Sequence, residues 1–338
     1  MSLSPRDSGT LPTPTMRGEA VAPSPLARST ATGRRRVSLL TRVRRSWGLY
    51  LALAPTLILI AVFAYWPTIN GIIQSFLNST NTQDNVFVGW DNYSQLLSDS
   101  VYWKAFINAI KYFVFGITVG WLLPFVTAEL LISLSNVRLQ YILRTALILP
   151  MAFPAAVFGF VWSFLYDGNQ GVINTFLHDV GLGGLAHNWI GDPSTALYAL
   201  MVIGFPIMFI SAGGGLPFLL LLGGLQGIPQ EILEAADLDG CTRLRRVFAI
   251  DIPLLGSQFS LLFMLALIGF TQAGSITLLL VTNGGPAYST MTPIVWLIQN
   301  GISAGNFGYG AAMGEVLFVF SVILSASFLA IQRWRVRL

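Results

Sequence analysis

The sequence contains few charged residues and a single cysteine. Asp, Glu, Lys and Arg make up 10% of the 338 residues, whereas soluble domains contain about 25%. Hydrophobic residues make up 54%. This composition excludes an ordinary soluble protein and indicates a chain embedded in a lipid bilayer. The one cysteine, Cys241, excludes an internal disulfide and a metal cage built from cysteines.

Several chemical sites are also missing from the sequence. It has no GxxxxGK[ST] loop, so the chain cannot hold ATP phosphates in that way. The two histidines, His178 and His187, stand without clustered carboxylates, and we expect no metal site. An intramembrane enzyme would need a nucleophile with a base, or a metal cluster, inside the apolar segments. We find neither and expect no catalytic residue.

Residues 1–45 lack the apolar periodicity that would pack a core. They contain five prolines among Ser, Thr, Gly and Arg, and six arginines lie between Arg34 and Arg45. This composition predicts a disordered basic tail. A cleaved signal peptide would have a shorter basic prefix and a shorter apolar run. We therefore expect a retained first helix and a membrane domain over 46–338.

Gaps between charged residues predict six membrane-spanning helices, and hence an all-α, multi-pass protein. A helix needs about 20 apolar residues to cross a hydrocarbon core of about 30 Å. The fourth predicted span contains prolines and glycines, and such breaks are tolerated only where protein or a water-lined cavity satisfies the backbone. The predicted spans are 49–66, 103–131, 145–166, 196–222, 257–281 and 309–331.

Basic residues are distributed unequally between the connecting segments. The two ends of the chain, the loop at 132–144 and the loop at 223–256 hold 17 of the 19 Lys and Arg residues. The remaining two, Lys104 and Lys111, lie near the start of the second span. Because basic residues accumulate on the cytoplasmic side, both termini and these two loops are expected there. The basic excess thus reports topology and does not indicate a nucleic-acid partner.

The segment 228–253 has the pattern of a helical hairpin. Pro229 suits a helix start, Glu231 and Glu234 favour the positive end of the helix dipole, and Gly240 can end the helix in a left-handed conformation. In the second helix Leu244, Val247 and Phe248 fall on one face. Periodicity alone leaves open a simple connector that lies on the lipid headgroups.

Several residues of this segment match a longer motif. Glu234-Ala235-Ala236, then Gly240, Ile250 and Ile252-Pro253, resembles the EAA loop (EAA-x3-G-x9-I-x-LP) of ATP-binding-cassette (ABC) importer permeases. The chain departs from that pattern with Ile252 in place of Leu, and with Cys241 where Ala is common. Neither change affects the residues that predict the two helices and the turn of the hairpin.

Two further segments are similar to the carbohydrate branch of these importers. Residues 87–93 (FVGWDNY) resemble its FVGLxNY segment, and residues 282–286 (TNGGP) are similar to its TNGGP turn. The resemblance implies a type I permease fold in a bacterial or archaeal plasma (inner) membrane. It also implies the partners: a second permease, an ABC ATPase dimer and an extracytoplasmic sugar-binding protein, within membrane lipid. ATP and Mg would bind the ATPase, and this chain would bind no cofactor.

The resemblance also assigns roles to residues. The EAA hairpin is expected to dock on the ATPase, with Glu234 pairing a basic residue, Ala235 and Ala236 allowing close approach, and Gly240 making the turn. The residues expected to couple the chain to the ATPase are Glu234, Ala235, Ala236, Asp239, Gly240, Ile250 and Pro253.

A substrate path is expected before the TNGGP turn. Sugars stack on aromatic faces and bond to hydroxyl and amide groups. The residues expected to line the path are Phe270, Thr271, Gln272, Ser275 and Glu315. Gly274 replaces a side chain that often supplies an amide, and Thr271 and Gln272 could equally join helices to each other.

Other interpretations remain open at this point. An importer permease for an amino acid or phosphate would share the architecture. A secondary transporter would more often carry intramembrane charge pairs and a repeat, and has no use for the hairpin. Glu129, near the cytoplasmic end of the second span, is expected to pair with Arg138 or Arg144.

Overall fold

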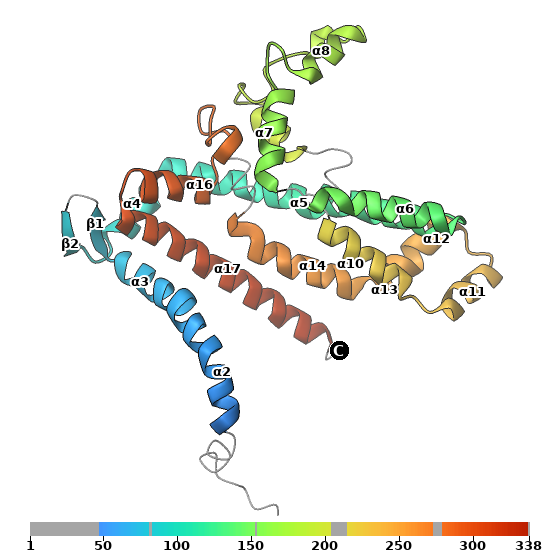
Figure 1. The fold of residues 1–338 in the computed structure, drawn as a ribbon, viewed down its shortest axis with the longest axis horizontal. Helices are drawn as coiled ribbons and strands as arrows, with labels where there is room; N and C mark the ends of the chain where they lie inside the picture. The colour runs from blue at the N-terminus through green and yellow to red at the C-terminus, as the bar shows by residue number, and fades with distance from the viewer. Residues whose placement is uncertain (1–46, 81–82, 153, 204–214, 273–278, 337–338) are drawn as a thin grey trace, which may run out of the picture. The chain divides into compact units, whose positions relative to one another are not determined.

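The chain forms two compact units, Met1–Leu59 and Ile60–Leu338, and each is described by itself. Helices make up most of what the computed structural model describes (Figure 1), as the sequence predicts. The predicted basic tail, 1–45, lies outside the described residues. The described residues are 47–80, 83–152, 154–203, 215–272 and 279–336.

The first apolar stretch is helical in three parts. α2 (Trp47–Ile60) is followed by a π-helical turn (Ala61–Tyr65) and by α3 (Trp66–Gln74). Pro67 lies in the first turn of α3, where a missing N–H removes no helical hydrogen bond. The first predicted span is therefore a helix, and it continues beyond Trp66.

A short antiparallel sheet follows and is the one departure from the predicted all-α class among the described residues. β1 (Leu77–Thr80) pairs with β2 (Gln83–Phe87), with Leu77 opposite Phe87. Asn92, in α4 (Asp91–Ser98), donates a hydrogen bond of 2.9 Å to the backbone carbonyl of Ser75. This bond fastens α4 to the chain that leaves α3.

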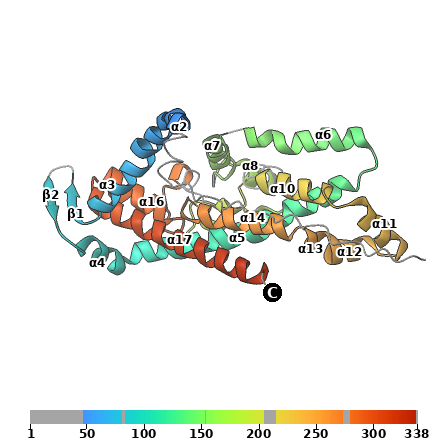
Figure 2. The same cartoon turned by 90° about the horizontal axis from the view of Figure 1, so that it is seen from below.

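α5 (Ser100–Ile132) is the helix against which much of the larger unit packs. Asp99 caps its first turn by accepting hydrogen bonds from the backbone N–H groups of Val101 and Tyr102. α10 (Gly215–Gln226) runs beside α5 (Figure 2). The apolar core between these helices and their neighbours contains Phe125, Ala128, Leu131, Phe218, Leu221, Leu222, Leu225, Leu255 and Leu262.

The third predicted span is divided. It begins within α6 (Val137–Ile148), passes through a 3-10 turn (Leu149–Ala152) and ends in α7 (Ala155–Leu165). Pro150 and Pro154 explain the division, because proline lacks an N–H and disfavours helical geometry in the residue before it.

The connection to the fourth span is built from short elements. It contains α8 (Val172–Asp179) and a 3-10 turn (Gly183–Leu185). α9 (Ala196–Met201) and α10 occupy the two ends of the predicted fourth span. The middle of that span, 204–214, lies outside the described residues.

The predicted hairpin and the last two spans complete the chain. The helices of the hairpin and of the fifth span are α11 (Gln230–Leu238), α12 (Arg243–Arg246), a π-helical turn (Val247–Asp251), α13 (Ile252–Leu254) and α14 (Gly256–Gly269). After these come a 3-10 turn (Phe270–Gln272), α16 (Pro293–Leu297), a π-helical turn (Ile298–Ser303) and α17 (Phe307–Val336).

Three described helices are long and apolar enough to cross a membrane: Tyr50–Ser75, Ser100–Ile132 and Phe307–Trp334. Two bent pairs, Gly215–Gln226 with Gln230–Leu238 and Arg243–Leu254 with Gly256–Gln272, raise the number to five if each pair is one span. Among the described residues the first, second and sixth predicted spans therefore correspond to long helices. The count of six stays a prediction.

Candidate functional site

The hairpin predicted at 228–253 is present. α11 begins directly after Pro229, and the chain reverses at Gly240, whose φ of +67° is left-handed. A Cβ on this glycine would meet no heavy atom within 4 Å. The backbone N–H of Cys241 donates to the carbonyl of Ala236 at 2.9 Å and closes the turn. Glycine is thus needed at position 240 for its backbone conformation and not for lack of space.

One side of the hairpin is open to solvent in this chain. Glu234, Ala235 and Asp239 are exposed, as is Gly240 at the turn. Ala236 is buried, with 6% of its surface exposed, so it packs within the chain itself. The first helix and the turn therefore offer a small-residue surface with two carboxylates at its edge.

The end of the hairpin is less open. Pro253 is exposed, whereas Ile250 is half-buried. Ile250 therefore contributes to packing behind the open face, and Pro253 lies where α13 leads into the bend before α14.

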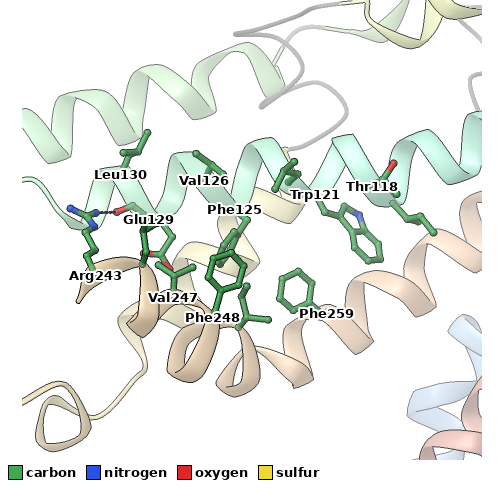
Figure 3. Close-up of a pocket in the computed structure, with 14 residues that line it drawn as sticks. Thr118, Trp121, Phe125, Val126, Glu129, Leu130, Arg243, Val247, Phe248 and Phe259 are labelled. Carbon is green, nitrogen blue, oxygen red and sulfur yellow. Dashed lines mark hydrogen bonds between the residues drawn. The ribbon is translucent and has the colours of Figure 1, made fainter. Parts of the chain in front are cut away.

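The second half of the hairpin faces α5 across a groove of about 460 Å³ (Figure 3). Leu244, Val247 and Phe248 all line it, which confirms that they share one face. α5 contributes Trp121, Phe125 and Val126 among others, and α14 contributes Phe259. The groove is lined mainly by apolar side chains, with Glu129 and Arg243 at one end and Thr118 at the other (Figure 3).

A group of charged residues lies at that end, and its two acidic members are buried. Arg246 Nε is 3.2 Å from Asp251 Oδ2, and Arg243 Nη2 donates a hydrogen bond of 3.0 Å to the backbone carbonyl of Glu129. Asp251 has no exposed surface and Glu129 has 7%. The charged groups that act on the Glu129 carboxyl are those of Asp251, Arg246 and Arg243.

The predicted partners of Glu129 were therefore wrong. Neither Arg138 nor Arg144 acts on its carboxyl, because the hairpin supplies the neighbouring charges. The sequence analysis also missed Asp251. The signal available was an acidic residue inside the apolar run from Val247 to Ile252, where an ionised group needs a partner.

The structure separates the residues predicted to line the substrate path. Phe270 is 4% exposed and packs among other aromatic rings, with ring centroids 5.7 Å from Phe106, 5.5 Å from Phe113 and 5.5 Å from Phe320. In this conformation its faces are covered by phenylalanines, and it offers no open surface for stacking.

Thr271 and Gln272 instead line a second cavity. It has a volume of about 670 Å³ and lies between α14, α16 and α17. Ser321 and Ser325 of α17 line it too, and the Ser321 hydroxyl is buried without a hydrogen-bond partner. The cavity thus combines hydroxyl and amide groups with an apolar wall. The sequence analysis missed both serines, which stand four residues apart on the last span.

Of the other two predicted path residues, the structure describes one. Ser275 lies outside the described residues. Glu315 is absent from the cavity lining and lies against α3, where a Cβ on Gly71 would stand 3.2 Å from Glu315 Oε1. Glu315 therefore belongs to the contact between α17 and α3.

Asp99 joins three helices at the opposite end of α5. Its Oδ2 accepts hydrogen bonds from Tyr309 Oη of α17 at 2.6 Å and from Trp296 Nε1 of α16 at 2.8 Å. Burial raises the pKa of this carboxyl, but the bonds from Tyr309 and Trp296, with those from the N–H groups of Tyr102 and Val101, outweigh it. The pKa of Asp99 is therefore lowered.

Comparison with known proteins places the chain among transport permeases. Residues 116–337 match the family described as binding-protein-dependent transport system inner membrane component. The chain is 30% identical over 285 residues to the sulfoquinovosyl glycerol transport system permease protein of Agrobacterium fabrum, which covers 84% of this chain and 89% of that protein. It is 32% identical over 282 residues to the sn-glycerol-3-phosphate transport system permease protein of the same organism, covering 82% and 92%.

An archaeal protein and two crystal structures are similar as well. The trehalose/maltose transport system permease protein of Thermococcus litoralis is 30% identical over 291 residues, with 85% of this chain and 94% of that protein covered. A bacterial ABC transporter involved in the import of alginate matches with a TM-score of 0.76 at 19% identity, covering 87% of this chain and 98% of the other. The same fold recurs in the alginate transporter in complex with an alginate pentasaccharide-bound periplasmic protein, at a TM-score of 0.76 and 18% identity. These likenesses confirm the predicted permease fold of ABC importers.

Proposed function

Because the chain belongs to the family of binding-protein-dependent transport system inner membrane components, we propose that it is the permease subunit of an ATP-driven importer for a carbohydrate. It is a transport subunit and not an enzyme. The observation that carries the proposal is the hairpin with a left-handed turn at Gly240 and exposed Glu234 and Ala235. Relatives named for sulfoquinovosyl glycerol, glycerol phosphate, and trehalose or maltose support a carbohydrate as the cargo.

The hairpin is the part that receives force from ATP hydrolysis. ATP and Mg would bind a separate ATPase dimer, whose surface meets the exposed face of α11. Glu234 would pair with a basic residue there, Ala235 would permit close approach, and Asp239 would add a second carboxylate. Ala236 and Ile250 would act inside the hairpin by keeping it rigid, since both are at least half covered.

The complete importer needs further subunits. We expect a second, related permease beside this one, and an extracytoplasmic sugar-binding protein that delivers the cargo. The alginate transporter has been crystallised with its periplasmic protein, which supports the latter. The location that follows is the plasma (inner) membrane of a bacterium or archaeon.

The cavity at Thr271 is our candidate for this chain's part of the path. Thr271, Gln272, Ser321 and Ser325 can exchange hydrogen bonds with sugar hydroxyls, and apolar side chains form most of the remaining lining. No Lys or Arg lines it, so a phosphate ion would find no counter-charge among the described residues. The cavity therefore offers hydroxyl and amide groups to a polyol or sugar, and no cation to a free phosphate ion.

A substrate screen tests the proposal. The permease is purified with its co-expressed permease, ATPase and binding protein, and ATP hydrolysis is measured with panels of sugars, amino acids and phosphate. We expect one or a few carbohydrates to stimulate hydrolysis only when the binding protein is present. Stimulation by an amino acid or phosphate alone would reject the carbohydrate assignment, and no co-purifying ATPase would reject the importer.

Substitution of Gly240 tests the hairpin separately. Gly240→Val places a β-branched residue at φ +67°, which costs on the order of 1–2 kcal/mol in backbone strain although the site is open. We expect uptake and ATPase association to fall while membrane insertion persists. Gly240→Asn is the matched control, because asparagine tolerates this conformation better. Normal uptake by the Val variant would make the segment a simple connector.

A further inference from the structure

The charges between α5 and the hairpin contain two buried oxygens without a donor. Asp251 Oδ2 meets Arg246, but Asp251 Oδ1 has no hydrogen-bond partner, and neither has Glu129 Oε1. The two carboxyl groups are within hydrogen-bonding reach of each other. Each of the two carboxyl groups therefore has one buried oxygen without a donor.

Two ionised carboxylates in this arrangement would repel each other, because burial strengthens the repulsion between like charges. One proton shared by the two carboxyl groups removes the repulsion and supplies the missing donor. A protonated carboxyl donates a hydrogen bond to its ionised neighbour, which satisfies both unpartnered oxygens and leaves one negative charge between two arginines. Carboxyl pairs that cannot both ionise are known to share a proton in this way.

We propose that Glu129 and Asp251 share one proton and, with Arg243 and Arg246, form a latch that makes the hairpin and the cytoplasmic end of α5 move as one body. The proposal rests on the proposed function, since it gives the hairpin's movement a route into the membrane domain. Glu129 and Asp251 are positioning residues and touch neither ATP nor cargo.

The surroundings explain why the joint depends on these four residues. The rest of the hairpin's side toward α5 lines the apolar groove, and attraction between apolar groups is non-directional (Figure 3). Hydrogen bonds between charged groups have fixed directions and are roughly twice as strong as neutral ones. Asp251 ends the π-helical turn Val247–Asp251, a distortion that is frequent at functional sites.

The other helices that pack against α5 place no further charged group beside Glu129 and Asp251. α10 and α14, which pack against α5, contain no Asp, Glu, Lys or Arg. α6 carries Arg138 and Arg144, which do not act on Glu129. Arg245 is exposed, and so are the acidic residues of α11, the first helix of the hairpin. Arg243 and Arg246 are therefore the positive charges that lie beside the pair.

Distance measurements between the hairpin and α5 test the latch. In the complete complex with Cys241→Ser, spin labels are attached to Arg245→Cys on the hairpin and Val114→Cys in α5, both exposed in this chain. Label 114 lies fifteen residues, about 22 Å, along α5 from Glu129. Distances are recorded with ADP and with ATP plus vanadate, which holds the ATPase closed. We expect the same distribution in both states, because the labelled parts move together.

Variants and pH distinguish the latch from ordinary packing. Glu129→Leu leaves Asp251 Oδ1 without a donor, and we expect a broadened distribution that shifts on ATPase closure. Glu129→Gln can donate from its amide and should behave like the wild type. Raising the pH until the shared proton is lost should broaden the wild-type distribution but not that of the Gln variant. Ser133→Ala, at the same end of α5, is the matched control and should change nothing.

Each contrary result has one meaning. A wild-type distance that shifts on closure at pH 7, or a Gln variant that broadens like the Leu variant, would overturn the latch. A Gln variant that broadens with rising pH in parallel with the wild type would overturn the shared proton. These tests remain available if the Leu variant fails to assemble. A hairpin that binds no ATPase would instead reject the proposed function, because the complex would not form.

Discussion

Phe270 and Thr271 are adjacent in the sequence but lie in different surroundings. Phe270 is enclosed by three other phenylalanines, and Thr271 lines the cavity between α14, α16 and α17. A sequence motif assigns both to one path because it cannot tell which way each side chain turns at the end of a helix. In the structure the 3-10 turn at Phe270–Gln272 directs them to different sides.

Substituting each of the two residues should give different losses. Phe270→Ala leaves a cavity in an aromatic core and should cost about 3–5 kcal/mol, with a lower yield of folded complex. Thr271→Val conserves shape but removes the hydroxyl, so yield should hold while uptake falls. Yield, melting temperature and uptake per molecule are measured on both variants, using the sugar that stimulates hydrolysis most. A well-folded Phe270→Ala complex that has lost uptake would restore the sugar-stacking role.

The elements of this chain differ in how far local sequence determines them. The hairpin was predictable because its turn, its first helix and its apolar face depend on neighbouring residues such as Gly240 and Val247. Pro150 and Pro154 could also have predicted the interruption of the third span. The uncharged stretch was long enough for one helix, and the sequence analysis therefore predicted a single span. The Glu129 contacts were not predictable, because Asp251 and Arg243 reach it from a distant segment through packing.

The junction at Asp99 determines how α5, α16 and α17 meet, and its stability should depend on pH. Because the pKa of Asp99 is lowered in the folded chain, its stabilisation is complete above the unfolded value of about 3.9 and is lost as pH falls through the folded value. Asp99→Asn should lower the melting temperature at neutral pH, and the difference from the wild type should shrink below pH 4. Thermal unfolding of the detergent-solubilised complex measures both.

Other carboxyl groups also make the stability of the wild type depend on pH, so the wild type must be compared with Asp99→Asn at each pH. Hydrogen bonds from the N–H groups of Gln170 and Asn169 lower the pKa of Asp167, and bonds from the N–H and hydroxyl of Ser194 lower that of Asp192. Both also favour the folded chain at higher pH. A difference between wild type and Asp99→Asn that stays constant from pH 7 to pH 3 would show that the Asp99 charge does not stabilise the junction.

At the scale of the whole molecule, the charge asymmetry gives a topology that the fold alone does not. Since 17 of 19 basic residues lie in the ends and two loops, reporter fusions after Arg144 and after Arg337 should report the cytoplasm. A fusion at Asp179, the end of α8, should report the outside. An odd number of crossings between Arg45 and Arg333 would contradict the six-span prediction.

The turn of the hairpin also holds the chain's single thiol. Cys241 follows Gly240 and is half-buried, with its backbone tied to Ala236. A fluorescent maleimide would therefore label this chain at one position, beside the face proposed to meet the ATPase. Emission from that dye would follow docking in real time without any engineered cysteine, so the native protein carries its own optical reporter of the transport cycle.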